Sequence, residues 1–194
     1  NGVMLEWDAQ AKAFEAYVTG KTVAEVEAIT TQTLESGYVI ATDDALLSAG
    51  CTIQITDFIE AVVKACKDEQ GMAFKAAGEF TLGVAAKTGA ADSKAATADA
   101  EGLVAMYSDI ACAVVADGKV IATLNDAIQP KINITVAGVP TAQEFKGTKR
   151  ELKEGYNMAA YGQPNIEGGT VKEWYIQSAA FSNYVLGKTA AEIA

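Results

Sequence analysis

The stretch Val104–Ile128, with the sequence VAMYSDIACAVVADGKVIATLNDAI, decides the fold class. Apolar side chains alternate along residues 104–116, which is the two-residue period of a half-buried β-strand. Asp117 and Gly118 follow as a tight turn, because glycine tolerates the positive φ that a two-residue hairpin loop requires. Residues 119–128 are then the return strand, so the segment predicts an antiparallel hairpin.

Outward from this hairpin, the chain alternates short strands and amphipathic helices. Pro130 ends the return strand because proline lacks a backbone N–H, and residues 131–136 alternate again as a further strand. The other predicted elements are a short helix that begins at Thr42-Asp43-Asp44 and ends at Gly50, strands over 51–55 and 80–88, and helices over 57–68 and 148–156. Consecutive strands flanked by helices predict an α+β fold with an antiparallel sheet.

A duplication gives the clearest indication of domain organisation. Residues 6–27 align without a gap to residues 173–194, each with the residue 167 positions later. The identical pairs include Trp7/Trp174, Gln10/Gln177, Phe14/Phe181, Tyr17/Tyr184, Gly20/Gly187 and Glu25/Glu192. Each copy is predicted as a helix with an aromatic stripe, a glycine stop and a second helix opened by a Thr-x-x-Glu capping box. The stripe indicates core packing rather than a ligand platform, so we expect Trp7 and Trp174 to be buried in equivalent environments.

This duplication predicts how the chain is divided. Residues 1–30 are expected to be the tail helices of a preceding repeat unit. Residues 31–194 are expected to be one α+β repeat unit that ends in the second copy of the tail, and we expect the two parts to form one compact body.

The composition excludes several classes of partner. The 194-residue chain carries a formal net charge of −10, and Arg150 is its only arginine. Nucleic acids and anionic membrane surfaces are bound through clusters of Lys and Arg, which this sequence lacks. It begins Asn1-Gly2-Val3 without an initiator Met, so we expect that a leader or anchor once preceded it.

The absence of histidine restricts the possible chemistry. Without histidine there is no Ser-His-Asp or Cys-His pair, no imidazole proton transfer and almost no route to a catalytic zinc site. The carboxylate pairs Asp43/Asp44 and Glu151/Glu154 are interpreted as helix caps and solvated charges, so no enzyme is predicted. Three cysteines without a CxxC spacing predict no disulfide and no metal site. All three, Cys51, Cys66 and Cys112, are expected to be buried, reduced thiols.

Three stretches carry a resemblance to a known family. They are ADGKVIATLNDAIQPK at 116–131, Thr148–Leu152 followed by Tyr156–Met158, and Glu173-Trp174 leading to residues 184–189. In order and spacing, over residues 79–194, they resemble bacterial FMN-binding-like surface lipoproteins, which are exported tandem-repeat proteins of gut Firmicutes. The resemblance implies an extracellular, cell-surface protein that meets the membrane only through a removed N-terminal lipid anchor.

The resemblance also implies a flavin and a ligand region. Lys87-Thr88-Gly89-Ala90 departs from the covalent attachment motif, since Ala85 stands where that motif has Asp and Ala91 where it has Ser or Thr. The implied cofactor is therefore FMN held without a covalent bond, for electron transfer. The implied ligand residues are Gln129, Lys131, Lys149, Glu151, Tyr156 and Trp174. The alternative interpretation is that these residues bind no ligand. In it, Gln129 and Lys131 of the strand and Lys149 and Glu151 of the helix face solvent, and Trp174 lies in the core.

Two functions follow from these observations. The first is an exported surface module that binds a small ligand. The alternative is a structural or assembly unit of a tandem-repeat extracellular protein, in which the tail helices pack against neighbouring repeat units and no ligand is bound.

Overall fold

The chain forms two compact units, which divide between Gln70 and Gly71. The computed structural model describes residues 4–161 and 171–194. The sequence predicted a boundary at residue 30 and one compact body. The contacts instead place residues 31–70 in the same unit as the first tail, because the side chains of both segments share one core. That residues 1–30 descend from a preceding repeat stays a prediction.

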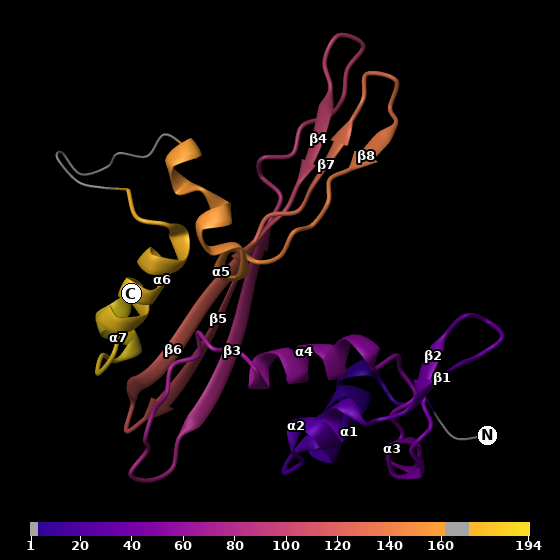
Figure 1. Cartoon of the computed structure of the whole chain (residues 1–194), viewed down its shortest axis with the longest axis vertical. Helices are drawn as coiled ribbons and strands as arrows, with labels where there is room; N and C mark the ends of the chain where they lie inside the picture. The colour runs from indigo at the N-terminus through magenta and orange to yellow at the C-terminus, as the bar shows by residue number, and fades with distance from the viewer. Residues whose placement is uncertain (1–3, 162–170) are drawn as a thin grey trace. The chain divides into compact units, whose positions relative to one another are not determined.

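Unit 1 is built mainly of helices (Figure 1). Its elements are α1 (Trp7–Val18), α2 (Val23–Glu27), β1 (Thr31–Thr33), β2 (Val39–Ala41), α3 (Asp44–Ser48) and α4 (Thr56–Cys66). Phe14 of α1 lies in the core with Leu46, Cys51 and Ile55. The first tail helix is thus an integral part of this unit.

Two predictions about unit 1 need correction. Residues 51–55 are not a strand but an irregular link between α3 and α4, because the backbone N–H groups of Thr52 and Ile53 bind the side chain of Gln10 instead of a neighbouring strand. Cys66 is exposed rather than buried, since it is the last residue of α4 and lies one turn beyond Val62, the last residue packed on the core. The cysteines are free thiols, as predicted; Cys51 is buried, whereas Cys112, which was also expected to be buried, is half-buried.

Unit 2 is a long antiparallel ribbon with helices along it (Figure 1). Its strands are β3 (Thr81–Gly89), β4 (Gly102–Ala105), β5 (Tyr107–Ala116), β6 (Lys119–Ile128), β7 (Lys131–Ile134) and β8 (Pro140–Ala142). Two three-stranded sheets result, in the orders β3-β5-β6 and β4-β7-β8, and every strand pair is antiparallel. The predicted α+β class is confirmed.

The hairpin predicted at residues 104–128 is present, with one interruption. Asp117 and Gly118 both have positive φ, at 51° and 72°, as the turn requires. The first strand divides at Met106 into β4 and β5, opposite Pro130, which divides the partner into β6 and β7. The N–H of Met106 still donates to the carbonyl of Pro130, at 3.1 Å, so the ladder passes through the break.

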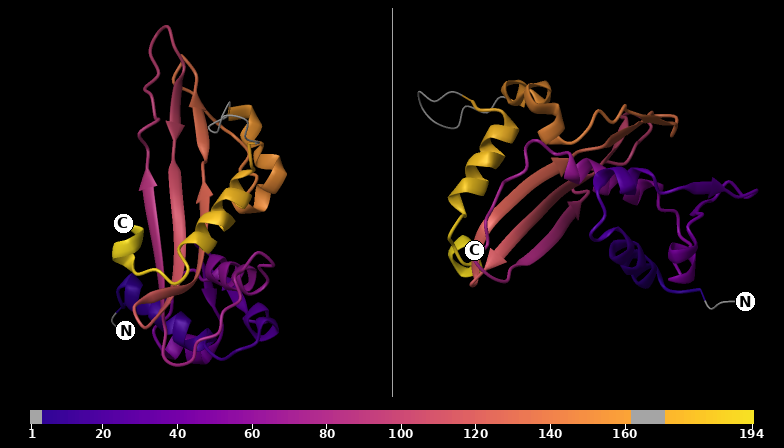
Figure 2. Two further views of the ribbon diagram at one scale, coloured as in Figure 1. Left: turned by 90° about the vertical axis from the view of Figure 1, so that its left-hand side faces the viewer. Right: turned by 60° about the horizontal axis from the view of Figure 1, so that its bottom comes forward.

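The second tail helix lies along one face of the β3-β5-β6 sheet (Figure 2). This helix is α6 (Trp174–Tyr184), and it is followed by α7 (Ala190–Ile193). The Ser178 hydroxyl donates to the Asn125 carbonyl at 3.0 Å, and the Asn125 amide donates to the Ser182 hydroxyl at 3.2 Å. Small side chains on this face of the sheet, such as Ala85 and Ala111, leave room for the helix.

Candidate functional site

The candidate site lies where β6 passes into β7, beside α5 (Lys149–Leu152). Lys149 is buried there, with 5% of its surface exposed. Its ammonium group lies 4.5 Å from the ring centre of Tyr107, 4.7 Å from that of Tyr156 and 5.3 Å from that of Trp174. It also donates a hydrogen bond of 3.1 Å to the Tyr107 hydroxyl. Aromatic faces attract a cation, so the three rings compensate in part for lost hydration.

The charges around Lys149 act in opposite directions. Burial lowers the pKa of Lys149, while the nearby carboxylates of Asp109 and Asp126 raise it. Asp126 has a second role, because one of its oxygens accepts the backbone N–H of Arg150 at 3.1 Å and that of Ala127 at 2.7 Å. Asp126 therefore holds the first turn of α5 against β6, which places Lys149 among the rings.

Gln129 and Tyr156 are directly bonded to each other. The Tyr156 hydroxyl donates to the side-chain oxygen of Gln129 at 2.8 Å. The Tyr156 ring stacks on that of Tyr161, with centres 5.2 Å apart and planes inclined by 18°. Burial is the main cause that raises the pKa of Tyr156, and neighbouring Tyr161 raises it further, so this phenol stays protonated.

A cavity of 310 Å³ brings four of the six predicted ligand residues together. Gln129, Lys131, Lys149 and Tyr156 line it, and they are joined by Gln143, Glu144, Phe145, Lys146 and Tyr161, among others. Lysines at three positions and one glutamate make its charged lining predominantly cationic, in a chain whose net charge is −10. Pockets of about 300–1,000 Å³ are typical of small-molecule sites.

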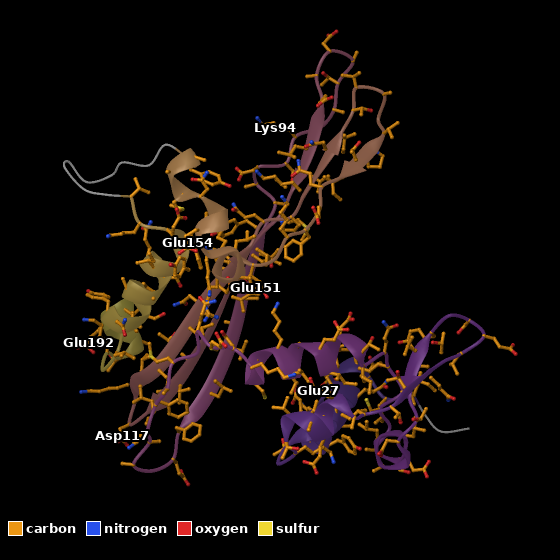
Figure 3. The ribbon with its side chains drawn as sticks, in the orientation of Figure 1. Glu27, Lys94, Asp117, Glu151, Glu154 and Glu192 are labelled. Carbon is orange, nitrogen blue, oxygen red and sulfur yellow. The ribbon has the colours of Figure 1, made fainter. Side chains whose placement is uncertain are left out.

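The remaining two predicted residues have other places. Glu151, labelled in Figure 3, closes a capping box at the start of α5, where its carboxylate accepts the Thr148 N–H at 2.8 Å. Trp174 contacts Lys149 but lines a second cavity of 490 Å³ between α6 and the sheet. Trp174 is not among the residues that line the first cavity.

Residues that the sequence analysis missed complete this cluster. Tyr107, Asp109 and Asp126 hold Lys149, yet they lie 42, 40 and 23 residues away in an unremarkable strand pattern. Their polar side chains interrupt an otherwise apolar alternation along the strands. This interruption is the feature of the sequence that could have identified them. Lys149 itself, the N-terminal residue of α5, is buried, which contradicts the structural interpretation that places it on a solvent-facing side of the helix.

We expect the Tyr107→Phe variant to be less stable than the wild-type protein near neutral pH. This difference in the free energy of unfolding should shrink as the pH rises. Burial, followed by the hydrogen bond to Asp109 and its charge, raises the pKa of Tyr107 to about 12 from an ordinary 10.0. A phenol with a raised pKa contributes stability that is fully present below pH 10.0 and is lost as the pH rises towards about 12. Because Tyr107 is partly exposed, we expect the contribution to be about 1 kcal/mol.

The measurement is urea unfolding of both proteins at several pH values between about 8 and 12. The wild-type protein should be the more stable one at the lower end, and the difference should shrink through the window set by the Tyr107 pKa. A difference that stays constant over this range would contradict the assignment.

Comparisons with known proteins add no family to this geometry. No protein-family model, no curated protein and no solved structure matches the chain. Within residues 4–161 and 171–194, no group of three or more His, Cys, Asp or Glu residues could hold a metal ion. No helix in the described part of the chain is long and apolar enough to cross a bilayer. The function is therefore argued from the site itself.

The two copies of the tail provide a second candidate surface. They have the same local structure, but different residues of each copy are packed against the rest of its unit. In each copy the glutamine donates to the carbonyl five residues before it, Gln10 to Leu5 at 2.7 Å and Gln177 to Lys172 at 2.8 Å. Both copies have a complete capping box at the start of the second helix, which ends with Glu25 in one and Glu192 in the other. The local structure of the tail is thus determined by its own residues.

Their environments differ, against expectation. Phe14 is 3% exposed, while its counterpart Phe181 is 49% exposed. Trp7 is 62% exposed, whereas Trp174 is half-buried beside Lys149. The prediction that both tryptophans are buried in equivalent places is wrong for Trp7, because its ring lies edge-on to that of Phe58, 5.9 Å away, and most of its surface stays in contact with solvent.

Proposed function

We propose that unit 2 is a binding module for a small anionic ligand with a flat aromatic part. The observation that carries this is the 310 Å³ cavity, whose lining places three lysines beside stacked tyrosine rings in an acidic protein. Lys131 and Lys146 are exposed, so their ammonium groups are available to an anionic group. The stacked pair Tyr156–Tyr161 supplies an aromatic wall, and Gln143 supplies an amide.

FMN belongs to this ligand class, and the lining fits it in part. Lys131 and Lys146 fit a phosphate, and Tyr156 and Tyr161 fit a flat ring. Lys149 does not act as a free cation, since its ammonium already faces three rings and the Tyr107 hydroxyl. Its role in the proposal is to hold Tyr156 in place, while a bound flavin would supply the redox chemistry for electron transfer.

The module is proposed to bind without catalysing through its own side chains. Catalysis near neutral pH without histidine requires a carboxyl or lysine with a suitably shifted pKa. The candidate carboxylates are shifted the other way: the Tyr17 hydroxyl lowers the pKa of Asp43, and the Tyr175 hydroxyl lowers that of Glu154. Such carboxylates are weak bases. A location outside the cell, held at the surface by a lipid anchor, is proposed on the family resemblance alone.

The test is a titration of FMN into the purified chain, followed by the quenching of flavin fluorescence. We expect saturable quenching, and we expect the double variant Lys131→Glu/Lys146→Glu to weaken binding by about 10-fold or more, because two cation–anion contacts become repulsive. Riboflavin, which lacks the phosphate, should bind more weakly than FMN and should be indifferent to the double variant.

Lys75→Glu provides the matched control, since Lys75 is exposed in unit 2 and does not line the cavity. It should leave FMN binding unchanged. An absence of quenching at high FMN concentration, together with an absence of direct binding of other aromatic phosphates, would refute the ligand-binding proposal.

A further inference from the structure

One face of the first tail helix is closed by the residues that follow it in the chain. The Gln10 side-chain oxygen accepts the backbone N–H groups of Thr52 and Ile53 at 2.8 and 3.1 Å, and also the Thr52 hydroxyl at 3.1 Å. The Tyr17 hydroxyl donates to Asp43 at 2.7 Å. Gln10, though polar, is only 2% exposed.

Apolar packing completes this closure. Phe14 belongs to the core formed by Ala41, Leu46, Cys51 and Ile55, and its ring lies 5.5 Å from that of Phe58. We call residues 39–62 the receptor segment, because they bind three side chains of the tail helix. Gln10 and Tyr17 are bound by hydrogen bonds, and Phe14 is bound by packing.

The second tail presents the same three side chains to solvent. Gln177 and Phe181 are exposed, and Tyr184 is 64% exposed. The local structure is the same down to the lysine that lies over the tyrosine ring, 4.2 Å from it for Lys21 on Tyr17 and 4.4 Å for Lys188 on Tyr184. The exposed face of α6 thus has a known complement, which is the receptor seen in unit 1.

Other positions of the two helices show the converse pattern. Ser182 of α6 is buried against Asn125 of β6, whereas its counterpart Glu15 of α1 is exposed. Trp174 packs on Lys149, whereas Trp7 lies edge-on to Phe58, 5.9 Å away, and is largely exposed. The sheet covers Ser182 in one copy, and residues 39–62 cover Gln10 and Phe14 in the other. The two contacts meet at Ala11 and its counterpart Ser178, which is bonded to the sheet.

We propose that α6 and α7 are the docking site for a second copy of residues 28–70. That copy would follow the second tail as residues 28–70 follow the first. Each tail would then lie between the sheet of its own unit and the receptor segment of the next, which makes this chain a repeat unit of a head-to-tail array. In that contact Gln177 accepts the backbone N–H groups of the second Thr52 and Ile53, Tyr184 donates to the second Asp43, and Phe181 enters the second core. The docking is independent of ligand binding in the cavity.

The 490 Å³ cavity is consistent with this arrangement. It is lined by Trp174, Gln177, Ser178 and Phe181 of α6 together with the sheet. The same helix positions in the first copy include Gln10 and Ala11, which are buried, and Phe14, which is packed on the core. The α6 positions whose counterparts are packed in unit 1 therefore still border open volume, which lies between α6 and the sheet.

The experiment extends the full chain by its own residues 28–70, joined directly after Ala194. We expect the appended segment to fold on α6, so that its Cys51 thiol reacts with a thiol reagent about 100-fold or more slowly than it does in an unfolded chain, as expected for a buried cysteine. Peptide mapping by mass spectrometry distinguishes the appended thiol from the original one when only the appended copy carries a neighbouring silent substitution, Gln54→Asn.

Phe181→Asp in the extended chain should abolish this protection, whereas Ala179→Asp should preserve it. Ala179 is exposed and aligns with Lys12, which is also exposed, so this position lies on neither contact face. Amide exchange of α7 in the unextended chain confirms for both variants that the tail itself still folds.

Two outcomes would overturn the docking proposal. The first is an appended segment that reacts at the unfolded rate, or that is protected equally with and without Phe181→Asp. The second is an unextended chain that sediments as a dimer and reverts to a monomer on Phe181→Asp, which would show that two tails cover each other.

Discussion

Phe14→Ala is expected to destabilise unit 1 by about 3–5 kcal/mol, whereas the same change at Phe181 is expected to cost less than about 1 kcal/mol. The two phenylalanines occupy equivalent positions in duplicated helices, but Phe14 is almost fully buried and Phe181 is half exposed. Truncation at Phe14 leaves a cavity among Leu46, Ile55 and Phe58, while truncation at Phe181 removes a ring already in contact with water.

The reactivity of Cys51 reports on this loss, because its thiol is buried in the same core and burial raises its pKa. A loss of about 3 kcal/mol raises the population of the open form by about 100-fold, and the labelling rate should rise with it. Phe181→Ala should leave the Cys51 rate unchanged. Equal effects of the two substitutions on the unit that carries them would show that the two helices are packed alike.

Gln10→Met is expected to destabilise unit 1 by about 3 kcal/mol, although methionine nearly preserves the volume of the side chain. The substitution removes the acceptor shared by the Thr52 and Ile53 backbone N–H groups and the Thr52 hydroxyl. Buried donors that lose their partner cost about 1–3 kcal/mol each, and partial access of water reduces the sum.

Gln177→Met is the matched control, and it should change stability by less than about 0.5 kcal/mol, because Gln177 is exposed. Unfolding in urea, followed by thiol labelling of Cys51 for unit 1 and Cys112 for unit 2, separates the two effects. If Gln10→Met proved as mild as Gln177→Met, the link between residues 51–55 and α1 would depend on apolar packing alone.

The candidate cavity was predictable in part from the sequence. Gln129 and Lys131 flank Pro130, which must end a strand, and residues at a strand end stand out even in a single sequence. The burial of Lys149 was not predictable, because it depends on Tyr107, Tyr156 and Trp174, which come from three separate elements. For Glu151 the sequence allowed both a ligand role and a capping role, because it stands at the capping-box spacing from Thr148. The structure shows the capping role.

The sequence by itself determined the features whose causes are local. The Asp117-Gly118 turn, the ladder through β5 and β6, the glycine stops and the capping boxes all follow from backbone preferences within a few residues. The tertiary structure alone decided which side of each tail helix is covered. Phe14 packs against the segment 39–62, whereas the identical Phe181 is half exposed and its neighbour Ser182 is the residue that meets Asn125 of the sheet. The burial of a residue depends on what packs against it, and the packing partners come from distant segments of the chain. The duplicated residues therefore determine the helix but not its environment.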